Sequence, residues 1–122
     1  MIKLIGGTGH VRGYQFRPNH DRRKIFGRFD LRSYADRYEI WSLSIIGEQR
    51  NKGYGKQMLT EFLQQFKADK PLFLYVFKTN EIAIRLYQKV GFTIVDDDRY
   101  NGIYKMQYVT FHFGDNVLLH LL

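Results

Sequence analysis

The chain has 122 residues, of which 44% are hydrophobic and 16% aromatic, and it carries a formal net charge of +7. This length suits a single domain over residues 1–122, and the apolar content excludes a disordered chain. Because the sequence contains no cysteine, disulfides, a thiol nucleophile and a cysteine zinc site are all excluded.

The first half of the chain is predicted to consist of strands. Residues 1–5 read as a short strand, residues 6–9 as a glycine-rich loop and residues 10–16 as a candidate strand. Residues 24–32 alternate between apolar and polar side chains, and residues 39–46 form a longer, more apolar strand. One face of this last strand is expected to carry Glu39, Trp41, Leu43 and Ile45.

The second half predicts two helices and three strands. An amphipathic helix begins at Gly53, and Asn80 caps a second helix that Gly91 ends. Residues 72–77 are continuously apolar, which favours a strand buried on both faces. An Asn-Gly hairpin turn joins strands at 92–95 and 103–109, which gives the order β-β-β-α-β-α-β-β. The aromatic residues assigned to the core are Phe62, Phe66, Phe73 and Phe92.

The segment between the strand at 39–46 and the first helix has the composition of a phosphate site. It contains the pattern Arg50-x-x-Gly53-x-Gly55, followed by Lys56 at the start of the helix. Glycine lets the backbone approach a ligand closely, and the first N–H groups of a helix attract anions. The spacing differs from the dinucleotide fingerprint and from the P-loop, which ends in Gly-Lys-Ser or Gly-Lys-Thr.

A second segment, residues 80–92, reads Asn-Glu-Ile-Ala-Ile-Arg-Leu-Tyr-Gln-Lys-Val-Gly-Phe. It matches N-x-x-A-x-x-L-Y-x-K-x-G-F, and together with the Arg50 pattern it resembles the GNAT superfamily of N-acetyltransferases. The resemblance covers about residues 39–108. It implies an α/β (α+β) fold with a mixed central sheet flanked by helices. Only about 20 residues precede the strand at 24–32, so the helices that GNAT domains usually carry there are missing.

The resemblance implies acetyl-CoA as cosubstrate and assigns a role to each matched position. The strand end would pair with the pantetheine arm, and the Ile45 N–H would donate to the oxyanion. Asn80 would contact the cofactor in addition to capping its helix. The residues expected to bind coenzyme A are Leu43, Ser44, Ile45, Arg50, Asn51, Lys52, Gly53, Tyr54, Gly55, Lys56, Asn80 and Tyr87.

Two residues are candidates for catalysis. Glu39 lies eleven residues before Arg50, where the resemblance implies a glutamate that takes the proton of the acceptor amine, directly or through water. The alternative for Glu39 is a strand-edge side chain that faces water. Tyr87 lies on the inner stripe of its helix, which favours a core residue, whereas the resemblance implies a general acid or a hydrogen-bond donor to the coenzyme thiolate. The four histidines have no i, i+4 pairing, and no metal site is expected.

The charge bears on the acceptor. Residues 1–56 hold 12 Lys and Arg against 5 Asp and Glu, whereas residues 57–122 hold 7 of each. A positive acceptor side disfavours polycations, and an open groove favours a primary amine on a protein lysine or N-terminus. Two alternatives stay open: an inactive GNAT module that binds coenzyme A or a protein, and a basic nucleic-acid-binding domain, although the sequence has no signature of the latter.

Location and assembly are also expectations at this point. No apolar stretch reaches the roughly 20 residues of a membrane span, which favours a cytoplasmic protein. The last six residues, 117–122, include five apolar ones. An exposed apolar tail is unfavourable on a monomer, so we expect it to cover a sheet, preferably in a homodimer through the C-terminal region.

Overall fold

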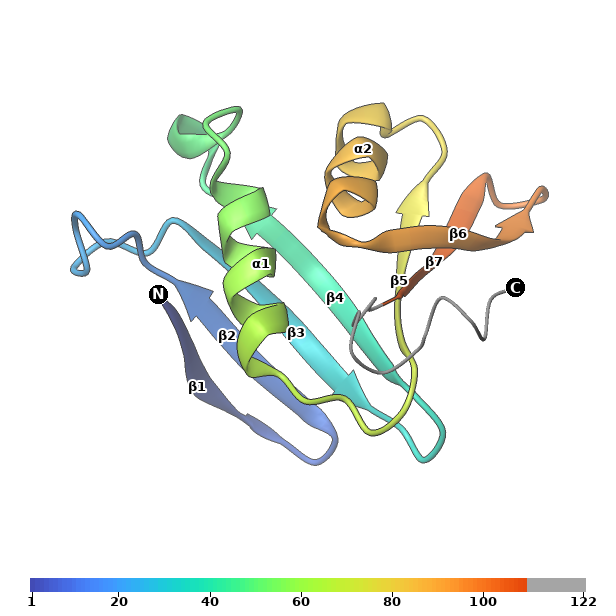
Figure 1. The fold of residues 1–122 in the computed structure, drawn as a ribbon, viewed down its shortest axis with the longest axis horizontal. Coiled ribbons are helices and arrows are strands. Elements are labelled where there is room, and N and C mark those ends of the chain that lie inside the picture. The colour runs from blue at the N-terminus through green and yellow to red at the C-terminus, as the bar shows by residue number, and fades with distance from the viewer. Residues whose placement is uncertain (110–122) are drawn as a thin grey trace, which may run out of the picture.

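The computed structural model describes residues 1–109, so the predicted apolar tail at 117–122 lies outside the described residues. One seven-stranded sheet runs through the molecule in the order β1-β2-β3-β4-β5-β7-β6 (Figure 1). All neighbouring strands are antiparallel except β4 and β5. The mixed sheet and its two helices confirm the predicted fold class. The elements are β1 (Ile2–Thr8), β2 (Val11–Phe16), β3 (Gly27–Ser33), β4 (Tyr38–Ile45), η1 (Gly47–Gln49), α1 (Tyr54–Gln65), β5 (Leu72–Phe77), α2 (Glu81–Val90), β6 (Phe92–Asp98) and β7 (Ile103–Tyr108).

Four strands precede the first helix, one more than in the expected order. Residues 6–8 were expected in a loop, but they continue β1, which pairs with β2 through a bulge between Leu4 and Gly6. Gly6 adopts φ 119°, a conformation that favours glycine and explains how the strand passes the bulge. The strand expected at 24–32 begins three residues later, at Gly27.

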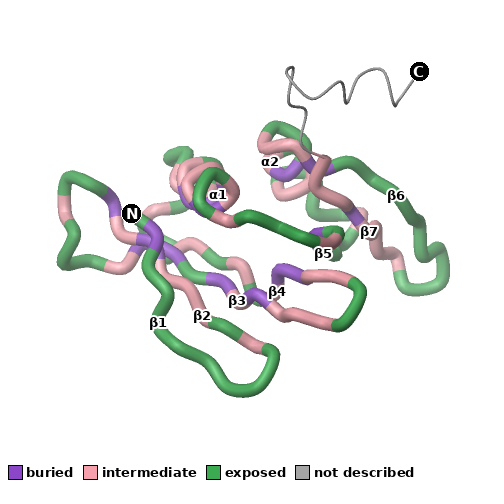
Figure 2. Tube along the Cα trace, turned by 60° about the horizontal axis from the view of Figure 1, so that its bottom comes forward, coloured by how far each residue is buried: buried purple, intermediate pink, exposed green. Residues whose placement is uncertain are grey.

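Both helices cover the same face of the sheet, as Figure 2 shows. The predicted amphipathic character of α1 is confirmed, because Met58, Leu59 and Phe62 are all buried. These side chains pack with residues of β3, β5 and β7 and with Tyr87 of α2 into one core. Burial of this apolar surface stabilises the fold. No helix within residues 1–109 is long and apolar enough to cross a membrane.

The opposite face of β5 is open, which contradicts the expected burial on both faces. Leu72, Leu74 and Val76 are buried toward the helices, whereas Tyr75 is 38% exposed and Phe77 is 62% exposed. Phe73 shares the open face and is only partly buried, so its assignment to the core was wrong. Within the described residues, no helix lies on this face of the sheet.

A bulge in β4 also changes the expected faces of that strand. Ser42 adopts φ 55°, and the pairing with β3 shifts between Arg28 and Asp30. Glu39 and Trp41 do share the open face, but after the bulge Leu43 and Ile45 turn toward the core. A plain alternation of side chains along β4, as expected from the sequence, was therefore wrong beyond Trp41.

The parallel strands β4 and β5 pair only at their beginnings. The ladder joins Tyr38–Ile40 to Leu72–Leu74, although β4 continues to Ile45 and β5 to Phe77. Beyond these three pairs the two strands separate. The backbone of the last part of β4 is therefore not paired with β5, which leaves an opening between the two strands.

Candidate active site

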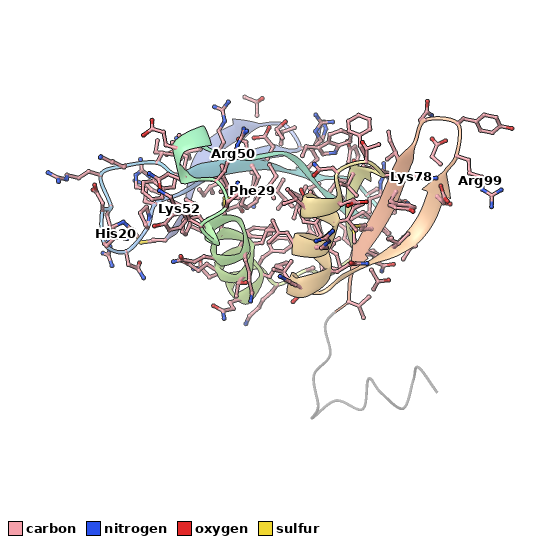
Figure 3. The ribbon with its side chains drawn as sticks, turned by 90° about the horizontal axis from the view of Figure 1, so that it is seen from above. His20, Phe29, Arg50, Lys52, Lys78 and Arg99 are labelled. Carbon is pink, nitrogen blue, oxygen red and sulfur yellow. The ribbon has the colours of Figure 1, made fainter. Side chains whose placement is uncertain are left out.

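The loop between β4 and α1 has the geometry of an anion site. Asn51 and Gly53 adopt left-handed conformations, with φ 62° and 84°, and Gly53 is the N-cap of α1. No side chain caps this helix, so its first N–H groups point into the loop without a side-chain partner. Arg50 and Lys52 extend from the same loop (Figure 3). Backbone donors and cations therefore converge where the sequence predicted a phosphate site.

Arg50 connects this loop to the end of β4. Its Nε donates a hydrogen bond to the Ile45 carbonyl oxygen at 3.2 Å. Ile46, the residue after Ile45, donates its N–H to the Phe26 carbonyl oxygen at 2.9 Å, on the β3 side. Because backbone groups alternate in direction along a strand, the N–H and C=O of Ile45 point toward the opening beside β5. An N–H in that position is available to a ligand.

The helix-end cavity has a volume of about 790 Å³ and lies against the ends of β4, α1 and α2. It contains every residue predicted to bind coenzyme A except Lys52, whose Nζ lies 3.4 Å from Gln49 Oε1 at the surface. Sequence reasoning missed part of its wall. The lining is Leu43, Ser44, Ile45, Gln49, Arg50, Asn51, Gly53, Tyr54, Gly55, Lys56, Asn80, Ile82, Ala83, Arg85, Leu86, Tyr87 and Lys89.

The missed residues of α2 follow a helical period. Arg85 and Leu86 are each three or four residues from both Ile82 and Lys89, so these four residues lie on one side of the helix. This spacing is visible in the sequence and identifies the side of α2 that faces the cavity. Leu86 also approaches α1: a Cβ built on Gly55 would lie 3.0 Å from its Cδ2. Gly55 therefore permits the close packing of the two helices.

The sheet-face cavity has a volume of about 660 Å³ and is lined by residues from both faces of the sheet. Tyr75 and Phe77 belong to the open face, whereas Val76 and Tyr87 belong to the helix side. The cavity thus passes through the opening between β4 and β5. The full lining is Glu39, Trp41, Tyr75, Val76, Phe77, Asn80, Tyr87, Asp96, Asp98, Ile103 and Lys105.

Glu39 is buried, with 4% of its surface exposed, so the alternative of a glutamate that faces water was wrong. Its carboxylate accepts hydrogen bonds from Arg37 Nε at 2.8 Å, Trp41 Nε1 at 2.7 Å and the Tyr75 hydroxyl at 3.3 Å. Burial acts to raise the pKa of Glu39, but the hydrogen bonds from Arg37 and Trp41 outweigh it and lower the pKa. Glu39 is therefore ionised at neutral pH.

Two residues of α2 line both cavities. Asn80 caps the helix as predicted, because its side chain accepts a hydrogen bond from the Ala83 N–H at 3.2 Å. Tyr87 is buried, and burial raises the pKa of its hydroxyl. The phenol therefore stays protonated at neutral pH. The two cavities meet at Asn80 and Tyr87.

Comparison of the whole chain with solved structures finds the same fold in several acetyltransferases. A Bacillus subtilis acetyltransferase in complex with CoA superposes with a TM-score of 0.70 at 17% identity, over 90% of this chain and 98% of that one. A spermidine N-acetyltransferase variant from Vibrio cholerae gives 0.69 at 18% identity, over 84% and 67%. The Escherichia coli ribosomal-protein-S18-alanine N-acetyltransferase gives 0.69 at 16% identity, over 92% and 77%.

Sequence comparison points to the same group. No curated protein sequence matches the chain significantly. The family model described as "Acetyltransferase (GNAT) family" matches residues 6–92, which is more than half of the chain. This match includes both β4 with the Arg50 loop and all of α2. The chain therefore belongs to the acetyltransferase (GNAT) family.

Proposed function

We propose that this protein is an acetyl-CoA-dependent N-acetyltransferase in which a primary amine attacks the thioester directly in a ternary complex. The observation that carries this proposal is the meeting of the two cavities at Asn80 and Tyr87. One cavity lies beside an anion site, and the other opens on the opposite face of the sheet. Two substrates entering from opposite faces would then meet beside the Tyr87 hydroxyl.

The helix-end cavity is the proposed site of acetyl-CoA. The N-terminal N–H groups of α1, together with Arg50, would hold the pyrophosphate. The pantetheine arm would follow Leu43–Ile45, where β4 no longer pairs with β5. Solved GNAT relatives in complex with CoA and with acetyl-CoA support this choice of cosubstrate. When bound, acetyl-CoA supplies a thioester carbon for attack and a thiolate leaving group.

The acceptor would enter through the sheet-face cavity. An alkyl ammonium has a pKa of roughly 10.4, so it must lose a proton before its nitrogen can attack. Glu39 is the carboxylate proposed to assist this loss of a proton. Because the pKa of Glu39 is lowered, direct transfer is strongly uphill, and we propose transfer through water to solvent.

Bond making and breaking then involve two further groups of this chain. As the new N–C bond forms, negative charge develops on the thioester oxygen, where the free Ile45 N–H would donate. As the C–S bond breaks, the Tyr87 hydroxyl would donate its proton to the departing sulfur. Its raised pKa keeps that proton in place until the thiolate forms. Solvent reprotonates the phenolate, and the nitrogen, which carries an extra proton after the N–C bond forms, releases that proton to water to give the neutral amide.

Calorimetric titration with acetyl-CoA, followed by free-thiol release with a panel of amines, tests this function. We expect acetyl-CoA to bind in the calorimetric titration. We expect free thiol to be released only when an amine is present. Binding without amine-dependent release would favour the inactive module instead. Absence of binding would overturn the proposed function. A titration with nucleic acid would then test whether the basic first half of the chain binds nucleic acid.

A further inference from the structure

We propose that the acceptor is a linear diamine that lies in the sheet-face cavity, with one amine at Tyr87 and the second, as an ammonium, beside Asp96. This inference rests on the proposed function, because it names the acceptor of the same reaction. It is carried by the charge of the cavity, its aromatic walls and the register of three strands.

The charge of the cavity is opposite to the sequence expectation of a positive acceptor side. Its charged lining residues are Glu39, Asp96, Asp98 and Lys105. Glu39 is paired with Arg37, and no ion pair in residues 1–109 involves Asp96 or Asp98. Hydrogen bonds from Asn101 lower the pKa of Asp98, so this carboxylate is ionised at neutral pH.

The cations on the β6 side of the cavity are directed elsewhere, whereas the Arg32 guanidinium lies over Trp41 on the β4 side. The Nζ of Lys105 lies 4.1 Å from the centroid of the Phe73 ring. Lys78 forms its ion pair with Asp97, on the other face of β6. Arg99 extends from the tip of the β6–β7 hairpin, away from the strands (Figure 3). The β6 side of the cavity therefore presents excess negative charge, which favours an acceptor that keeps a positive charge after the reacting amine is deprotonated.

Strand register places Asp96 on the same row across the sheet as Tyr75, which contacts Glu39. Tyr75 on β5 pairs with Lys105 on β7, and Lys105 pairs with Asp96 on β6. The Tyr75 hydroxyl in turn reaches Glu39 on β4. Two strand spacings, roughly 10 Å, separate the backbones of Tyr75 and Asp96. Tyr87 lines the same cavity, so a short flexible chain laid across the strands would extend from Tyr87 toward Asp96.

Aromatic side chains line the path between these two ends. Trp41 and Tyr75 lie with ring centroids 5.7 Å apart, and Phe77 is 62% exposed beside them. Rings of this kind bind both methylene groups and ammonium ions. The face already shows this affinity for cations, because the Arg32 guanidinium stacks 4.5 Å from the Trp41 centroid. A diamine with an apolar linker matches such walls, whereas an anionic acceptor does not.

The experiment compares kcat/KM for putrescine and for n-butylamine, which has the same carbon chain but lacks the second amine. Both are measured with saturating acetyl-CoA on the wild type and on Asp96→Asn. The matched control is Asp97→Asn, which removes the same charge from the same strand. Asp97 pairs with Tyr104 and therefore lies on the other face of the sheet. Asp98 is left unchanged, because it accepts hydrogen bonds from Tyr100 and Asn101 in the hairpin turn.

We expect the wild type to prefer putrescine, and Asp96→Asn to lower that preference by about fivefold at most, the size of one solvent-exposed ion pair. Asp97→Asn should change the preference by less. Equal rates with the two amines, equal effects of both variants, or transfer to a lysine peptide without preference for diamines would overturn the inference. In these outcomes acetyl transfer still occurs. Failure of the proposed function itself is distinct, because acetyl-CoA would then not bind or no amine would be acetylated.

Discussion

The indole Nε1 of Trp41 donates a hydrogen bond to the Glu39 carboxylate at 2.7 Å. A glutamine at position 39 keeps one acceptor oxygen, so it can accept from Trp41 or from Arg37 but not from both, and it loses the negative charge. We expect Glu39→Gln to lower kcat by about 10- to 100-fold, because proton removal from the amine loses its carboxylate. Free-thiol release measures the rate. The control is Glu61→Gln on α1, outside both cavities; equal losses in the two variants, or none in Glu39→Gln, would remove Glu39 from the mechanism.

The same carboxylate predicts how stability depends on pH. The folded pKa of Glu39 is lowered below its ordinary value, so its contribution is present above that value and lost as pH falls through the folded pKa. We therefore expect the wild type to exceed Glu39→Gln in free energy of unfolding at neutral pH. The difference should shrink as pH falls through the folded pKa of Glu39, because a protonated glutamate resembles glutamine. Urea unfolding of both proteins checks this. A difference independent of pH would mean that ionisation of Glu39 does not stabilise the fold.

The two glycines of the phosphate loop differ in what an added side chain would meet. Gly53→Val meets no atom within 4 Å but forces a side chain into φ 84°, whereas a Cβ at Gly55 meets Leu86 at 3.0 Å. Both Gly53→Val and Gly55→Val should weaken acetyl-CoA binding in calorimetry, because side chains would occupy the proposed pyrophosphate site. Unchanged affinity in both folded variants would contradict the assignment of the loop.

Gly55 makes a second test available. In a double-mutant cycle, the loss of stability caused by Gly55→Ala should be smaller in a Leu86→Ala background, which removes the Cδ2 atom. The corresponding penalty of Gly53→Ala should not depend on Leu86, because it arises from backbone strain of about 1 kcal/mol. If Leu86→Ala changes the loss of stability equally for Gly53→Ala and Gly55→Ala, the contact with Leu86 does not distinguish the two glycines.

The phosphate loop was predictable because its residues are contiguous. Arg50, Gly53 and Gly55 lie within six positions, and their loop follows a strand and precedes a helix in the sequence itself. The pairing of Glu39 with Arg37 and Trp41 was also accessible, since residues two apart share a face of a strand.

The acidic side of the acceptor cavity was not accessible in this way. Asp96 meets Tyr75 only because β7 inserts between β5 and β6, and a single sequence does not give strand order. The bulge at Ser42 has no sequence signal either, because serine is not a residue that favours positive φ. Total charge likewise suggested a positive acceptor side, whereas the local lining carries carboxylates.

Assembly is a further prediction from the sequence. We expect a homodimer through the C-terminal region, because residues 117–122 contain five apolar residues in six. Deletion of residues 115–122 should shift the species in light scattering from dimer to monomer, or cause aggregation. A full-length protein that is monomeric at high micromolar concentration would rule out the dimer.

A substitution of Tyr87 can separate its proposed catalytic role from its role in packing. Its ring packs against Phe92, with centroids 6.2 Å apart, and the residue lines both cavities. Tyr87→Phe keeps the ring and removes only the hydroxyl, so we expect little change in the thermal midpoint. The value of kcat should fall by about 10- to 1000-fold, and by more than the apparent KM for acetyl-CoA rises, because the proton is needed only as the thiolate forms. Phe92→Leu is the matched packing control: it should lower the thermal midpoint without a comparable fall in kcat. If Tyr87→Phe and the wild type turn over equally, Tyr87 serves the core alone.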